Sequence, residues 1–273
     1  MGAWSPAARF LPDETRAHQN PEAAASSDGR VAVVYQVHTG AGYDVHVREW
    51  SGQAWGTALA VSGEATSDWD PTAAYDAKNR LHIAWSGFSD GDYDIYHLKL
   101  PDPPARVSAR GEYDMHPSLA ASPDGLVWLA WDAVTIDHHG LSGRTTITGA
   151  NRRAAGIPDD DYETVHSATH RAAIEVRAID GDTIRVPGRP RDEIAAPKGY
   201  LIAHCGLPRI AAGPKGEPWI AYRALHRLGV PWSAGLRDGY LWEVLARPFR
   251  DGAWQEPVLL FEFLPQFLAC GPR

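Results

Sequence analysis

One phrase recurs four times along the chain and constrains its fold more than any other feature. Each copy begins at a proline, passes through small residues and a turn, and continues as an apolar stretch that ends in an aromatic residue. The four copies span residues 21–35, 71–85, 117–131 and 208–222. Their turns are Asp28-Gly29, Lys78-Asn79, Asp124-Gly125 and Lys215-Gly216. Such turns between apolar stretches predict tight antiparallel β-hairpins.

A second phrase follows the first and alternates apolar with polar residues, as a strand with two different faces does. It occupies residues 43–50 and returns at 93–98 and 241–247. In the first unit a further strand is expected to end at Val61. Each unit therefore reads as a four-stranded meander, with strands a, b, c and d in chain order. Pro21, Pro71 and Pro117 are spaced like the blades of a β-propeller, which run about 40–50 residues. We predict an all-β chain, a β-propeller of four-stranded antiparallel blades.

The repeat also predicts where the blades begin and end within a single propeller domain or fragment, 1–273. Residues 1–20 are expected to be the outer strand of a preceding blade, and 265–273 the start of a further unit or a tail. The whole blades are predicted at 21–70, 71–116, 117–207 and 208–264, with an insertion of about 132–171 in the third. Four units with fragments at both ends do not obviously close a ring, so we expect part of a longer chain.

Composition excludes several classes of protein. The formal charge of -8 argues against a nucleic-acid partner, which favours a basic surface. No stretch approaches the roughly 18 apolar residues of a membrane span. The two cysteines cannot form a disulfide framework or a CxxC metal site. No secretory signal is visible at the start, and no cofactor is predicted.

The Asp-Gly hairpins, the apolar strands that end in Ala-Trp or Ala-Tyr, and the phrase Gly91-Asp92-Tyr93-Asp94-Ile95-Tyr96 together resemble bacterial TolB-like, or WD40-like, propellers. The resemblance covers most of the chain except the insertion. It implies a module that acts alone, as a periplasmic interaction domain, or ahead of a covalently linked metal-dependent hydrolase domain. It also implies a periplasmic or secreted setting. The His-x-His cluster of that hydrolase domain and the Asp-box of sialidases are both absent from the sequence.

The long and chemically varied connections of the predicted meander are d–a and b–c, which emerge on one rim. Loops carried by a rigid scaffold are where function concentrates. The candidate ligand-binding residues on this rim are His18, Asp68, Trp69, Asp70, Asp114, His116, His204, Arg227 and Trp232.

Two groups of these polar residues allow more than one interpretation. Asp68, Asp70 and Asp114 suit the paired carboxylates of a glycosidase, whereas an Asp before proline also caps a turn. The weaker candidates for metal ligation are Asp137, His138, His139, His166 and His170. The alternative for these five residues is a solvated loop with scattered histidines.

The regular repeat without a recognisable catalytic signature favours a non-catalytic propeller that binds a protein, peptide or glycan through the d–a/b–c rim. Fold alone does not decide function, so two alternatives stay open. One is a carbohydrate-active hydrolase that uses rim carboxylates. The other is an accessory propeller of a larger metal-dependent hydrolase.

Overall fold

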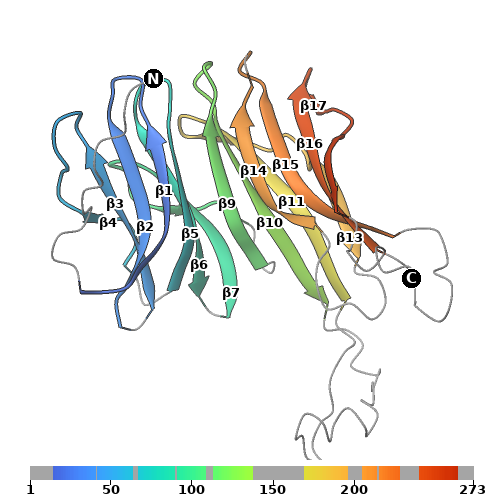
Figure 1. Cartoon of the computed structure of the whole chain (residues 1–273), viewed down its shortest axis with the longest axis horizontal. Coiled ribbons are helices and arrows are strands. Elements are labelled where there is room, and N and C mark those ends of the chain that lie inside the picture. The colour runs from blue at the N-terminus through green and yellow to red at the C-terminus, as the bar shows by residue number, and fades with distance from the viewer. Residues whose placement is uncertain are drawn as a thin grey trace, which may run out of the picture.

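The structure, a computed structural model, consists of β-strands in all its regular elements. It describes residues 15–40, 42–63, 67–89, 91–108, 113–137, 169–195, 205–213, 215–227 and 240–263. The strands form four antiparallel sheets that follow one another along the chain (Figure 1). Within these residues there is no helix of the length and hydrophobicity that crossing a bilayer requires.

Each sheet is a meander, because its strands pair in chain order. Blade 1 contains β1 (His18–Ala25), β2 (Val31–His38), β3 (Tyr43–Trp50) and β4 (Leu59–Ala60). Blade 2 contains β5 (Ser67–Tyr75), β6 (Leu81–Ser89), β7 (Asp92–Lys99) and β8 (Ala105–Arg106). Blade 3 contains β9 (Tyr113–Ala121), β10 (Val127–Asp137), β11 (Thr169–Asp180) and β12 (Thr183–Arg185). Blade 4 contains β14 (Cys205–Ala212), β15 (Pro218–Arg227), β16 (Tyr240–Arg250) and β17 (Ala253–Trp254). Four-stranded antiparallel blades confirm the predicted propeller architecture.

Blades 3 and 4 each carry a fifth strand that the repeat did not indicate. β13 (Arg191–Ala195) pairs with β11, and β18 (Val258–Phe263) pairs with β16. Each lies beside the same partner as the short strand before it, so the outer strand of these blades is interrupted rather than doubled. β10 and β11 also extend into the predicted insertion, up to Asp137 and from Thr169.

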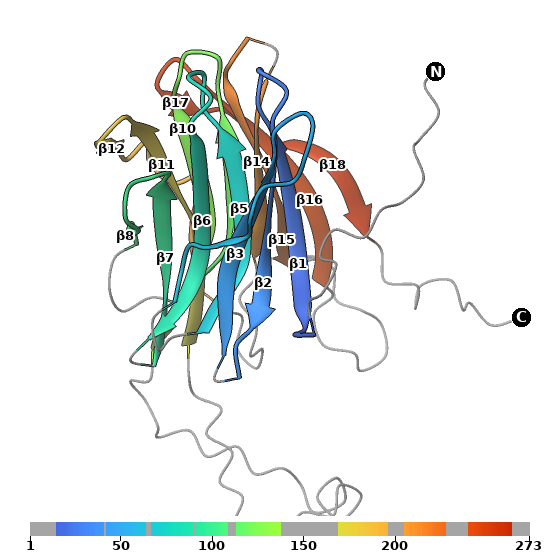
Figure 2. The same ribbon diagram turned by 90° about the vertical axis from the view of Figure 1, so that its left-hand side faces the viewer.

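The sheets pack face to face in sequence order, through their first strands β1, β5, β9 and β14. In Figure 2 the strands of blade 2 lie next to one another, with β8 and β7 toward the outer edge and β5 toward the inside. Buried apolar residues fill the space between successive blades, with Val34 and Ile83 between blades 1 and 2. Ile174 and Ile220 play the same part between blades 3 and 4. Ile95 and Leu129 do so between blades 2 and 3, so both faces of each inner blade are buried.

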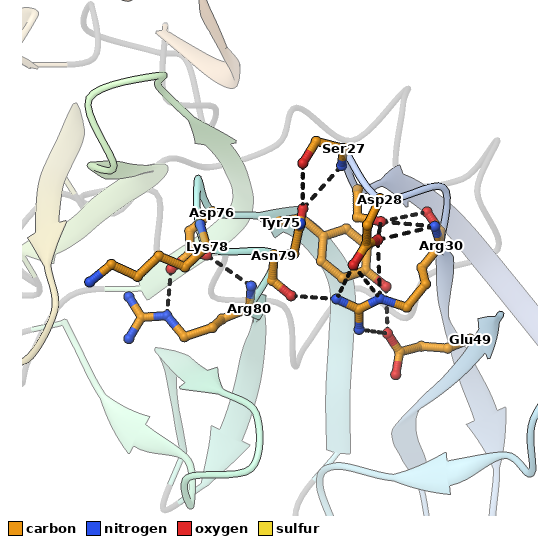
Figure 3. A network of polar contacts seen from close by, with 10 residues as sticks. Ser27, Asp28, Arg30, Glu49, Tyr75, Asp76, Lys78, Asn79 and Arg80 are labelled. Carbon is orange, nitrogen blue, oxygen red and sulfur yellow. Dashed lines mark hydrogen bonds and ion pairs between the residues drawn. The ribbon is translucent and has the colours of Figure 1, made fainter. Parts of the chain in front are cut away.

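Polar contacts connect blades 1 and 2 at the a–b turns (Figure 3). The backbone N and Oγ of Ser27 donate to Oδ1 of Asn79 at 3.0 and 2.9 Å. The guanidinium of Arg30 donates to the Asn79 carbonyl at 2.7 Å and lies 5.2 Å from the centre of the Tyr75 ring. Tyr75 in turn donates its hydroxyl hydrogen to Glu49. The tight turns that the sequence predicted therefore also align neighbouring blades.

A second set of contacts connects the blades near the axis, through the residue that follows the repeated proline. Thr72 Oγ1 donates to Glu22 Oε1 at 2.6 Å and accepts a hydrogen bond from the backbone N of Leu119 at 3.2 Å. Ser118 Oγ accepts in the same way from the backbone N of Ile210 at 3.1 Å. The same sequence position therefore links blade 1 to 2, 2 to 3, and 3 to 4.

Candidate ligand-binding site

The residue before the repeated proline has an unusual backbone conformation in every blade. The φ angles of Asn20, Asp70, His116 and Leu207 are 49°, 51°, 53° and 52°. A register shift interrupts the pairing of each first strand at this point, so the residue lies at a bulge inside the strand. Residues other than glycine rarely adopt positive φ, and such outliers often accompany functional sites. The interpretation as simple turn caps does not describe these positions, because they are not at turns.

Three of these residues line a cavity of about 230 Å³ that all four inner strands contribute to. The polar lining consists of Asn20, Glu22, Asp70, His116 and Arg209, and the remainder of three prolines, Pro21, Pro71 and Pro117. We call this cavity the axial pocket. It lies near the beginning of the inner strands, which is the end of the blades where the d–a and b–c connections emerge.

Hydrogen bonds hold the side chains of blades 1 and 2 in place at the axial pocket. Asn20 Nδ2 donates to Oε1 of the buried Gln36 at 2.5 Å and to Asp70 Oδ1 at 3.1 Å. Gln36 Nε2 donates to the Asp68 carbonyl at 3.0 Å. The buried amide of Gln36 thus fixes Asn20, and Asn20 fixes one oxygen of Asp70.

His116 sits between two carboxylates. Its Nδ1 donates to Oδ2 of Asp132 at 2.9 Å, and its Nε2 lies 3.7 Å from Oδ2 of Asp70. Asp132 is buried, and the same oxygen accepts a hydrogen bond from the backbone N of Leu207 at 3.0 Å. The hydrogen bond that His116 donates to Asp132 raises the pKa of His116, and the charges of Asp132 and Asp70 add to this rise. Burial opposes the rise.

A glycine allows β14 to approach Asp132 this closely. A Cβ at Gly206 would lie 3.1 Å from Oδ2 and 3.2 Å from Oδ1 of Asp132. That distance is shorter than ordinary van der Waals contact, so a side chain here would displace the carboxylate or the strand. Gly206 therefore permits the contact of Leu207 with Asp132, and through Asp132 it orients the ring of His116.

The predicted residues Asp68 and Asp114 occupy a different place from Asp70. Both are buried, and neither lines the axial pocket. Asp68 Oδ1 accepts a hydrogen bond from Trp85 Nε1 at 3.1 Å, and Asp114 Oδ1 accepts one from Trp131 Nε1 at 2.6 Å. The three acids of the predicted carboxylate cluster thus divide into two buried residues and one residue of the axial pocket.

Two further candidates lie against neighbouring aromatic rings. The ring of Trp69 packs on Tyr43, with 4.7 Å between the centroids, and is half-buried. The ring of His18 lies 5.7 Å from that of Tyr35. Neither residue belongs to the lining of the axial pocket.

The other candidates cannot be placed in the site. His204, Trp232, His138, His139 and His166 lie outside the described residues. Arg227, Asp137 and His170 are strand residues of β15, β10 and β11, and only their backbone is described. Among the residues that the structure does describe, no group of three or more His, Cys, Asp or Glu side chains is arranged to hold a metal ion.

Four residues of the site were not among the sequence-predicted candidates: Asn20, Glu22, Asp132 and Arg209. Asn20 and Glu22 flank Pro21, and Arg209 follows Pro208, so the repeat itself contained the signal. Aligning the four copies on their prolines would have brought these residues together with Asp70 and His116. Asp132 carried no such signal, since it immediately follows the aromatic end of a repeat copy.

Comparison with known proteins gives a likeness at the level of the fold. No model of a protein family matches the chain, and no curated protein matches it. A similar solved structure is a protein of unknown function from Dyadobacter fermentans, 12% identical, covering 89% of this chain and 70% of its own, with a TM-score of 0.48. A thermostable family-43 glycoside hydrolase is 10% identical over 88% of this chain and 74% of its own, with a TM-score of 0.43. An exo-1,5-alpha-L-arabinanase from a bovine ruminal metagenomic library is 11% identical over 89% and 78%, also with a TM-score of 0.43. Likeness of this degree gives no information on what this chain binds.

Proposed function

We propose that the protein is a non-catalytic propeller module that binds a glycan in the axial pocket. The observation that carries the proposal is the set of prearranged hydrogen-bonding side chains that four blades direct to one small cavity. Asp70 and the amide oxygen of Asn20 supply acceptors, and His116 and Arg209 supply donors. Sugar hydroxyls both donate and accept, so a mixed set of this kind matches them.

The size and polarity of the axial pocket favour a glycan over a protein surface. Its volume of about 230 Å³ is below the roughly 300–1,000 Å³ of pockets for drug-sized ligands, so one sugar unit is a suitable occupant. A stable protein interface instead needs an extended patch with a well-packed centre, usually with aromatic anchors. The polar lining of this pocket consists of side chains that are already held in position, which reduces the entropy lost on binding.

The proposal is tested by measuring the binding of a panel of monosaccharides and short oligosaccharides with saturation-transfer NMR. We expect at least one of them to bind the unaltered protein, and Asp70→Ala to weaken that binding about tenfold or more, because it removes the carboxylate acceptor. Asp102→Ala is the matched control, since Asp102 is exposed and outside the pocket. Failure of every saccharide to bind, or equal binding by Asp70→Ala, would overturn the proposal.

A carbohydrate-active hydrolase is the second candidate, because Glu22 and Asp70 line the same cavity as His116. Glycosidases use two carboxyl groups, commonly about 5–9.5 Å apart. If the unaltered protein hydrolyses aryl glycosides and both Glu22→Gln and Asp70→Asn abolish this activity, the protein is an enzyme and not a binding module. The third possibility, an accessory propeller of a hydrolase, remains a prediction of the sequence resemblance.

A further inference from the structure

The axial pocket carries opposite charges on its two sides. Glu22 and Asp70 come from β1 and β5, whereas His116 and Arg209 come from β9 and β14. His116 already faces Asp132 and Asp70, whereas a neutral sugar would offer no counter-ion to Arg209. The distribution of charge in the axial pocket therefore restricts the ligand further than the polarity of the pocket does.

Arg209 departs from the pattern of its repeat position. In blades 2 and 3 the residue after the proline is Thr72 or Ser118, and its hydroxyl accepts a backbone hydrogen bond from the next blade. In blade 1 it is Glu22, which accepts from Thr72. Arg209 instead lines the axial pocket, and its Nη1 donates to the carbonyl of Pro208 at 3.0 Å. A guanidinium has five N–H donors in a planar fork, so donors remain for a carboxylate in the pocket.

Arg209 and His116 also act on one another. The charge of Arg209 opposes the rise in the pKa of His116 that Asp132 and Asp70 produce. The imidazolium form of His116 therefore lies close enough to the guanidinium for repulsion. An anion against the guanidinium would offset that repulsion.

We propose that the glycan bound in the axial pocket is acidic, with the carboxylate of a uronic acid unit against the guanidinium of Arg209 and its hydroxyls toward Asp70 and Asn20. This inference rests on the proposed glycan-binding function and specifies its ligand. Hydroxyl groups are required on the β1 and β5 side, because Asp70 and Glu22 there repel a second negative charge. A small inorganic anion would satisfy only half of the pocket and should bind more weakly.

The test compares two pairs of sugars that differ in a single group. Isothermal titration calorimetry measures the affinity of glucuronate against glucose, and of galacturonate against galactose. We expect at least one uronate to bind roughly tenfold tighter than its neutral partner, since hydrogen bonds between charged groups are stronger than those between neutral ones. Arg209→Gln should remove this preference, and Arg185→Gln, an exposed arginine on β12 outside the pocket, should retain it.

The outcomes separate this inference from the function on which it rests. Equal affinity of the neutral and acidic sugars would overturn the acidic ligand and leave glycan binding in place. If neither these four sugars nor any other saccharide binds, both proposals are overturned. A preference for uronates that persists unchanged in Arg209→Gln would overturn the assignment of Arg209.

The titration of His116 gives a second readout, which a purely structural role of Arg209 would not alter. Facing His116 are Asp132, Asp70 and Arg209, and we expect a bound uronate to add a further negative charge. The pKa of His116, followed by NMR, should therefore rise on binding of a uronate and change little with a neutral sugar. By linkage, uronate affinity should fall as the pH rises through the pKa of His116. An unchanged pKa in the uronate complex would contradict the placement of the carboxylate.

Discussion

Nε1 of Trp131 donates a hydrogen bond of 2.6 Å to Oδ1 of Asp114, joining β10 to β9 inside blade 3. Trp85 and Asp68 repeat the pair in blade 2, at 3.1 Å. All four side chains are buried, so each indole N–H is satisfied by a carboxylate rather than by water. The repeated Asp–Trp pair is therefore part of what fixes the two strands in register.

Replacement of Asp114 by Ala should destabilise the protein by about 1–3 kcal/mol, because the buried Trp131 N–H loses its acceptor. Asp114→Asn should be milder, since its amide oxygen can still accept. Urea unfolding followed by tryptophan fluorescence measures both changes. The exposed Asp102→Ala is the control and should lie within about 0.5 kcal/mol of the unaltered protein. A similarly small effect of Asp114→Ala would show that the pair contributes little.

Thr72→Val should weaken the connection between three blades. The buried hydroxyl donates to Glu22 and accepts from the backbone N of Leu119, and valine retains the shape but neither hydrogen bond. We expect a loss of about 1–3 kcal/mol, because a buried backbone N–H is left without its partner. Thr72→Ser keeps the hydroxyl and should recover most of the loss in chemical denaturation. Equal losses in the valine and serine variants would contradict the assignment of the loss to the hydroxyl group.

Gly87→Ala should also be destabilising, for a steric reason. A Cβ at Gly87 would lie 2.8 Å from Cε2 of Tyr96 and 2.9 Å from Oδ1 of Asp68. Tyr96 stacks on Trp85, so it has little room to yield. Overpacking of this kind costs about 1–3 kcal/mol. Gly63→Ala is the matched control, because its Cβ would meet nothing within 4 Å. Thermal unfolding should separate the two variants, and coincident curves would contradict the predicted clash.

A pair of histidines, of which His82 is buried and His97 partly buried, predicts how stability depends on acid. Nδ1 of His82 lies 3.0 Å from Nε2 of His97, between β6 and β7. Burial lowers the pKa of both rings, that of His97 to about 3, and the mutual repulsion of the two rings adds to the effect on His97. In the unfolded chain a histidine takes up its proton near pH 6.5.

Between pH 6.5 and 3 the unfolded state therefore binds more protons at His97 than the folded state. Stability should fall as the pH drops through this window, by up to about 1.4 kcal/mol per pH unit for each proton. His97→Gln should make that fall shallower in denaturation curves measured at successive pH values. His38→Gln, at an exposed position, is the control. The same acid dependence in His97→Gln and the unaltered protein would rule out this origin.

The hairpins were predictable because their signal is local. A turn such as Asp124-Gly125 between two apolar stretches determines both strands and their direction, and the structure has β9 and β10 at those positions. The extra strands β13 and β18 had no counterpart in the repeat. They pair with β11 and β16 over a few residues each, and such pairing depends on tertiary context.

The site was only partly predictable, because it forms where four strands meet. Asp68 and Asp70 lie two residues apart in one strand, but Asp68 accepts a hydrogen bond from a buried indole whereas Asp70 faces the cavity. The sequence placed both on the rim and could not separate them, since a bulge and a positive φ at Asp70 set its direction. Arg209 was missed for a related reason. In the sequence it is an ordinary strand residue, and only the fold places it in the same pocket as His116.

The positive φ at the four positions before proline has a consequence for how binding preference can vary. Asn, Asp and His tolerate this conformation better than most residues, and they occupy three of the four positions. A redesign of the ligand preference at residues 20, 70 and 116 can therefore use only the few residue types that tolerate positive φ, whatever the ligand requires. The position one residue beyond the proline carries no such restriction, and it already holds Glu, Thr, Ser and Arg in the four blades. Of these four, Glu22 and Arg209 line the axial pocket, whereas Thr72 and Ser118 link the blades. A combinatorial library that varies residues 22 and 209, while leaving the strained positions as they are, is the design that this backbone permits.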